Sequence, residues 1–187
     1  MNLLAGPLFI ALGVLVVAGA AKLVRPSPTA AALGALHVPQ PLLAARALGA
    51  TEVALGIATA VTGEPLLFAG VAIAYGAFTI FILWALNGNQ DVVSCGCFGH
   101  EDTPPTPGHV AFNAAAAATA ALAVIDPVAI ADLDGTVAQQ ILTVALIGLG
   151  IVLVIAALTA LPRTLAIARG TAPAAIPTFS INSRGTS

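Results

Sequence analysis

Long apolar stretches separated by short polar connections are the feature that most constrains how this chain folds. Of its 187 residues, 59% are hydrophobic and 7% are charged, whereas a soluble domain is typically about a quarter charged. A helix needs roughly 20 apolar residues to cross a bilayer core of about 30 Å. We therefore place the chain in a lipid bilayer. Its formal net charge of -2 and lack of a basic patch argue against nucleic acid as a partner.

Five stretches approach the length of a membrane span, and we predict an all-α, polytopic membrane helix bundle. The predicted spans are residues 3–21, 41–62, 65–86, 109–125 and 138–161. Pro41 is tolerated in the first turn of a helix, and Gly63-Glu64-Pro65 predicts a tight turn between two spans. Small residues four apart, such as Ala45 and Gly49, allow helix backbones to approach closely in lipid.

The basic residues predict how the chain sits in the cell membrane. Three lie in or beside the connection between the first two spans and three follow the fifth span: Lys22, Arg25, Arg46, Arg163, Arg169 and Arg184. Since basic residues are retained on the cytoplasmic side, we expect the N-terminus outside and the C-terminus inside. The connection that follows the third span is then cytoplasmic as well.

That connection carries both cysteines of the chain, in the sequence Cys95-Gly96-Cys97. Two thiols separated by one glycine can close a small, strained disulfide ring, and strained disulfides are the more readily reduced ones. The pair therefore predicts thiol–disulfide exchange. Two alternatives remain: a metal site in which His100 or His109 joins the thiolates, and two inert thiols. A cytoplasmic location of this pair conflicts with a stable disulfide, because stable disulfides are found in oxidising compartments.

Ionisable and polar side chains inside the spans are candidate supporting residues. Glu52 lies near the middle of the second span, where a carboxylate should face the bundle interior with a partner. Tyr75 is at a similar depth in the third span, so we expect it to be a donor to Glu52. Lys22, near the end of the first span, is expected to extend its amine to the interface.

His109 and Asn113 lie four residues apart at the start of the fourth span and so share one helix face. A cation or a donor beside a thiol favours the thiolate, so this pair could adjust the redox centre. The alternative for both residues is capping and hydrogen bonding between helices.

Several of these residues together resemble the MauE family of methylamine-utilisation membrane proteins, which is related to the DoxX-like four-helix proteins. The similarity covers residues 1–125 and is carried by four short segments: Gly19-Ala-Ala-Lys22-Leu23, Ala50-Thr51-Glu52, Cys95-Gly-Cys-Phe-Gly99 and Asn113. It implies a four-helix core in residues 1–125. Beyond the similarity, residues 126–169 are predicted to form a connection and a fifth transmembrane helix. Residues 170–187 are rich in Ala, Pro, Ser and Thr and are predicted to be a disordered tail.

The resemblance implies a membrane redox protein that exchanges electrons with a thioredoxin-like partner through Cys95 and Cys97. Such exchange would support maturation of an exported or membrane redox enzyme, which leaves open whether the chain is itself a thiol–disulfide oxidoreductase. Since the chain has no second cysteine pair, quinone is a candidate electron acceptor. Two departures from the family pattern are the fifth span and Phe112, which stands where a basic residue often precedes the asparagine. The alternatives are an accessory subunit of a larger, respiratory-type membrane complex and a metal-handling protein.

Overall fold

The computed structural model describes residues 4–87, 106–132 and 135–160, and these residues form helices and no strands. The α-helices are α1 Ala5–Val24, α2 Ser27–Ala35, α3 Pro41–Thr62, α4 Pro65–Leu86, α5 Pro107–Ala123 and α6 Val137–Thr159, with a short 3₁₀ turn at Ile130–Asp132. The predicted all-α bundle is confirmed. The five predicted spans correspond to α1, α3, α4, α5 and α6.

Local sequence signals determine where the helices begin and end. α3, α4 and α5 all start with a proline in the first turn, where the missing N–H would have no partner inside the helix. α3 ends at Gly63, whose φ of 67° is a left-handed conformation that suits glycine. α6 starts with a capping box in which Thr136 and Gln139 satisfy each other's backbone N–H groups.

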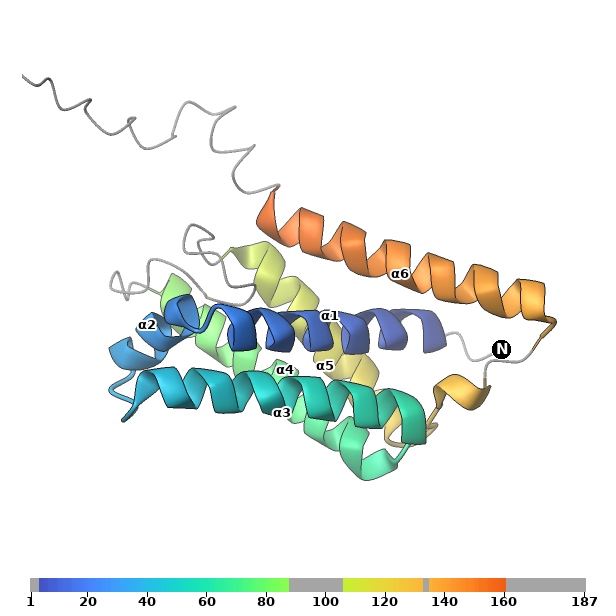
Figure 1. Cartoon of the computed structure of the whole chain (residues 1–187), viewed down its shortest axis with the longest axis horizontal. Helices are drawn as coiled ribbons and strands as arrows, with labels where there is room; N and C mark the ends of the chain where they lie inside the picture. The colour runs from blue at the N-terminus through green and yellow to red at the C-terminus, as the bar shows by residue number, and fades with distance from the viewer. Residues whose placement is uncertain (1–3, 88–105, 133–134, 161–187) are drawn as a thin grey trace, which may run out of the picture.

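Helix α1 lies at the centre of the arrangement (Figure 1). It packs against α3, which runs antiparallel to it, and against α6, which runs parallel to it. Helices α4 and α5 pack side by side as an antiparallel pair. One end of the bundle therefore gathers the last turns of α1, α4 and α6 and the first turns of α3 and α5.

The outer surface of the bundle is apolar, as a lipid-facing surface should be. Exposed large apolar side chains occur along α4 and α6, and the most exposed of them include Leu66, Ile73, Ile80, Val137 and Ile141. Four helices are long and apolar enough to cross a membrane: α1, α3, α4 and α6. α5 has 17 residues, about 26 Å at 1.5 Å per residue. Together these features identify a multi-pass membrane protein.

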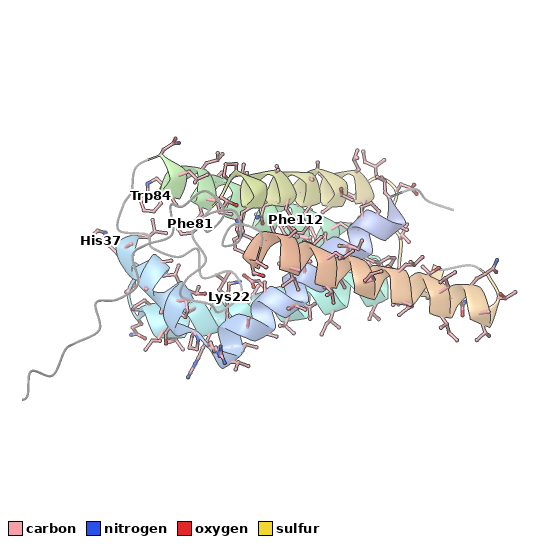
Figure 2. The ribbon with its side chains drawn as sticks, turned by 90° about the horizontal axis from the view of Figure 1, so that it is seen from above. Lys22, His37, Phe81, Trp84 and Phe112 are labelled. Atoms are coloured by element: carbon pink, nitrogen blue, oxygen red, sulfur yellow. The ribbon has the colours of Figure 1, made fainter. Side chains whose placement is uncertain are left out.

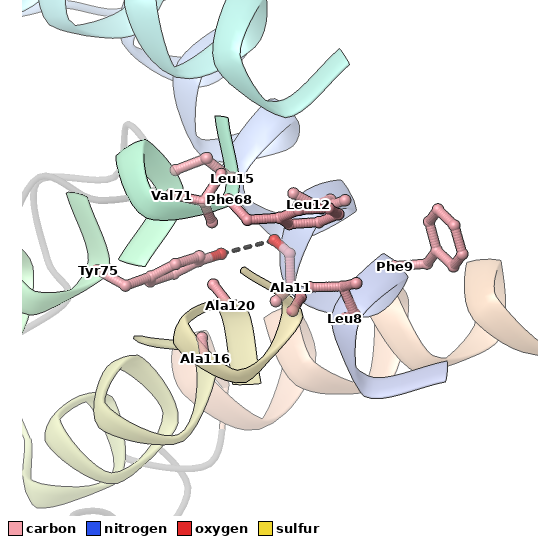
Figure 3. Packing of buried hydrophobic residues seen from close by; sticks show 11 residues of the cluster. Leu8, Phe9, Ala11, Leu12, Leu15, Phe68, Val71, Tyr75, Ala116 and Ala120 are labelled. Atoms are coloured by element: carbon pink, nitrogen blue, oxygen red, sulfur yellow. Dashed lines mark hydrogen bonds between the residues drawn. The ribbon is translucent and has the colours of Figure 1, made fainter. Parts of the chain in front are cut away.

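The centre of the bundle is a cluster of apolar side chains from α1, α4 and α5 (Figure 3). Leu8, Leu12 and Leu15 of α1 belong to this cluster together with Phe68 of α4, and all four are nearly inaccessible to solvent. The small side chains of α5 in this cluster, Ala116 and Ala120 among them, allow close approach of the neighbouring helices. In lipid such packing stabilises the bundle through van der Waals contact.

Helix α2 is an element that the apolar stretches do not predict. It has nine residues and lies in the first connection, between α1 and α3. Its buried residues include Thr29, Ala30 and Ala32, and it packs against α3. A helix this short leaves little periodic pattern in the sequence, so its packing is visible only in the fold.

Candidate functional site

Helices α1 and α3 cross at two glycines, Gly19 and Gly49. A Cβ atom added to Gly19 would lie 2.7 Å from the carbonyl oxygen of Gly49, and one added to Gly49 would lie 2.7 Å from the carbonyl oxygen of Gly19. Real Cβ atoms essentially never come this close to another heavy atom. The close approach of the two backbones therefore depends on glycine at both positions.

This crossing brings together a buried ion pair. Lys22 follows Gly19 by three residues and Glu52 follows Gly49 by three, so each charge lies on the same helix face as its glycine. The Lys22 Nζ atom lies 2.8 Å from Glu52 Oε2, and Lys22 and Glu52 are 3% and 2% exposed. Charges within a membrane are costly unless they are paired, and this geometry supplies the pair.

The structure corrects two expectations about this pair. Lys22 does not extend to the interface: it is buried, donates to Glu52 and lies 5.5 Å from the centre of the Phe78 ring. Tyr75 does not donate to Glu52, because its hydroxyl donates to the carbonyl oxygen of Ala11 at 2.6 Å (Figure 3). The expectation that Glu52 faces the interior with a partner is confirmed, but its partner is Lys22.

A cavity of about 30 Å³ lies beside Lys22, with walls from α1, α4, α5 and α6. Its polar wall consists of Lys22, Tyr75, His109 and Asn113. Phe78 and Phe112 contribute aromatic wall, and each ring meets the Tyr75 ring edge to face. Leu158 is the residue of α6 in the wall. In Figure 2, Lys22 and Phe112 lie in the half of the molecule that also holds Phe81 and Trp84, near the end of α4.

His109 and Asn113 share a buried face of α5, as predicted. The Nδ2 group of Asn113 donates to the carbonyl oxygen of His109 at 2.7 Å. The Nδ1 atom of His109 lies 2.8 Å from Thr106 Oγ1, a contact that fixes the ring. Within the described part of the chain, His109 Nε2 is buried and has no hydrogen-bond partner, as is also true of Glu52 Oε1. A buried polar atom of this kind calls for an explanation.

The cysteines and His100 lie outside the described residues. They belong to the connection between α4 and α5, and the described residues on either side of this connection are Asn87 and Thr106. Both attachment points are at the bundle end where α1 and α6 finish. Among the described residues, no group of three or more His, Cys, Asp or Glu could hold a metal ion.

Sequence reasoning identified Lys22, Glu52, Tyr75, His109 and Asn113 individually, and the structure brings four of them to one cavity and Glu52 into contact with Lys22. It missed the pairing of Gly19 with Gly49 and the part that Thr106 and Leu158 play. The spacing of Gly19 to Lys22 and of Gly49 to Glu52, three residues in each case, is the signal that could have revealed the crossing.

Residues 1–126 match the model of the family described as methylamine utilisation protein MauE. The chain belongs to the MauE family. The match covers the MauE-type core of α1 to α5 and ends before α6. No curated protein and no solved structure matches the chain. The ion pair, His109 and Asn113 therefore lie within the MauE region, while Leu158 comes from outside it.

Proposed function

We propose that this protein is a membrane thiol–disulfide redox protein in which Cys95 and Cys97 exchange electrons with a thioredoxin-like partner. The observation that carries the proposal is the attachment of the cysteine segment to α4 and α5 at the end of the bundle that also holds the buried ion pair and His109. Membership of the MauE family and the Cys-Gly-Cys spacing support the same chemistry.

The proposed reaction is a pair of exchange steps that balance in electrons. The thiolate of one cysteine attacks a partner's disulfide, which forms a mixed disulfide and releases one partner thiolate. The second cysteine then attacks the mixed disulfide, closing the Cys95–Cys97 bond and releasing the partner as a dithiol. Two electrons pass to the partner in this direction. The reverse sequence returns them.

The α1–α3 crossing supports the proposed thiol–disulfide exchange by holding the charges of Lys22 and Glu52 at a fixed place inside the bundle. Buried charges that are paired and hydrogen-bonded keep a defined geometry, and removing one partner is costly. The family is described by its role in methylamine utilisation. We propose that the exchange supports maturation of an exported or membrane redox enzyme of that process.

Trapping of the mixed disulfide tests the proposal. In the full chain, Cys97→Ser removes the thiol that would resolve a mixed disulfide on Cys95, and Cys95→Ser removes the thiol that would resolve one on Cys97. One of the two variants should accumulate a covalent complex with a thioredoxin-like protein that reducing agent releases, and the double serine variant is the matched control. If neither single variant forms such a complex and growth on methylamine survives the double variant, the redox function is wrong.

A separate experiment determines on which side of the membrane Cys95 and Cys97 lie. A membrane-impermeant thiol reagent applied to intact cells should leave Cys95 and Cys97 unlabelled if they are cytoplasmic, as the distribution of basic residues predicts. Labelling in intact cells after reduction would place the exchange outside and make the partner an exported protein.

A further inference from the structure

We propose that the cavity between α1, α4, α5 and α6 is a water site through which His109 exchanges protons. The proposal is argued from described residues alone. Its role in catalysis rests on the proposed thiol–disulfide function, whereas the binding of water does not.

The size of the cavity suits water. A cavity needs roughly 10–15 Å³ to hold one water molecule, and this one measures about 30 Å³, which is enough for one or two. An engineered cavity of about 150 Å³ is the size that accepts a benzene ring, so this space does not enclose a ring of that size.

The cavity also offers the polar partners that a buried water requires, which usually number two to four. The Nε2 atom of His109 lacks a hydrogen-bond partner among the described residues, and His109 is 1% exposed. Asn113 uses one Nδ2 proton on the His109 carbonyl oxygen and has a second. The Tyr75 hydroxyl donates to Ala11, so its oxygen can accept from a water. All three side chains line the cavity.

Charged and titratable groups approach His109 from three elements. Lys22 of α1 lines the same cavity and is held by Glu52 of α3, while Tyr75 comes from α4. The residue that α6 adds to the wall is the apolar Leu158. His109 thus shares the cavity with one paired cation and one hydroxyl, and α6 adds an aliphatic side chain to the wall.

The arrangement around His109 is that of a positioned acid–base group. When Nδ1–H donates to Thr106 Oγ1, the Nε2 atom is the ring's acceptor and is free to accept from a water. Thiol exchange needs a proton to leave the attacking thiol and a proton to return to the leaving thiolate. His109 takes up the first through the water and returns it to the second, so no net proton is consumed.

The water site can be tested without any thiol chemistry, using magnetic resonance on the full chain in lipid bilayers with nitrogen-15 in its histidines. Polarisation should pass from bound water to the His109 ring, a signal that His109→Gln identifies by removing it.

Ala18→Val adds two methyl groups to the cavity wall and should abolish the transfer. Val14→Leu, which adds one methylene to the same wall, should weaken it if Ala18→Val fails to fold. Ala20→Val alters an exposed position on the same helix and should leave the transfer intact. Absence of the transfer in the wild type, or its persistence when the cavity is filled, overturns the water site.

The catalytic role is tested by the rate of disulfide exchange with a reduced thioredoxin, measured in water and in deuterium oxide. Positioned acid–base catalysis contributes roughly 10²–10⁴-fold, so His109→Gln should slow exchange at least tenfold. Ala18→Val should slow it similarly and should lose the solvent isotope effect, which a purely structural change would not move. If the cavity is dry in Ala18→Val and both rate and isotope effect match the wild type, the relay is wrong while the redox function stands. Loss of the redox function would instead appear as no exchange in the wild type, with the water signal unchanged.

Discussion

Helix α1 makes two contacts through glycine, and they differ in what the glycine meets. At the α1–α3 crossing, a Cβ on Gly19 or Gly49 would collide with a backbone oxygen of the other helix. At the α1–α6 contact, a Cβ on Gly150 would meet the side chain of Ile10, and one on Gly13 would meet Ile151. A backbone atom cannot move without shifting its helix, whereas the end of an isoleucine can rotate away.

The difference separates a rigid contact from an adaptable one. The rigid contact lies inside the region that matches the MauE family and fixes the ion pair of Lys22 and Glu52. The adaptable contact joins that region to α6, whose one buried residue is Leu158. Helix α6 therefore adds an apolar residue to the wall of the cavity that His109 lines, without setting the geometry of the charges.

The largest effect should come from breaking the ion pair. Glu52→Gln leaves the Lys22 charge buried without its counter-charge, and loss of one member of a buried pair costs about 3–5 kcal/mol. Unfolding of the purified protein in mixed detergent micelles measures the free energy of unfolding.

The double variant Lys22→Met with Glu52→Leu is the matched control for that experiment. Replacing a buried pair with apolar residues of similar size is often neutral or stabilising, so this variant should recover most of the lost stability and leave thiol exchange impaired. Full exchange activity in a stable double variant would contradict a functional role for the pair.

The next largest effect tests the rigid contact itself. Gly49→Ala forces the α1 and α3 backbones apart, and overpacking of this kind costs about 1–3 kcal/mol. Gly76→Ala is the control, since a Cβ at that position meets nothing within 4 Å, and it should be neutral or slightly stabilising because alanine favours helix. Equal stability of the two variants would show that the crossing is not tight.

A smaller effect should follow from removing one hydrogen bond between α4 and α1. Tyr75→Phe deletes the hydroxyl that donates to the Ala11 carbonyl oxygen and should cost about 1 kcal/mol. The same change removes one partner of the proposed water, so polarisation transfer to His109 should weaken. Unchanged stability together with unchanged transfer would exclude both roles of the hydroxyl.

The smallest effect is expected at the adaptable contact. Gly150→Ala gains helix propensity of up to about 1 kcal/mol, and rotation of Ile10 offsets part of this gain, so the free energy of unfolding should stay within about 0.5 kcal/mol of the wild type. A loss as large as that of Gly49→Ala would place α6 in a contact as rigid as the α1–α3 crossing.

The sequence predicted the helices well because span length and apolar content are local properties. The range predicted for the second span coincides with α3. The interfacial position predicted for Lys22 and the partner predicted for Tyr75 were wrong. Both depend on where α1 meets α3 and α4, and no local pattern encodes that meeting. Glu52 illustrates both situations. Its burial could be predicted from its depth in a span, but its partner depends on the packing of two glycines that lie 30 residues apart in the sequence.

The most direct test of the central claim is to count the free thiols of Cys95 and Cys97 by alkylation after an acid quench, in the full chain held in a bilayer. The resting protein should take up no alkyl group. Within seconds of adding reduced thioredoxin it should take up two, and oxidised thioredoxin should reverse the change. If both cysteines are alkylated from the outset and oxidised thioredoxin leaves them so, the pair does not exchange and the account is wrong.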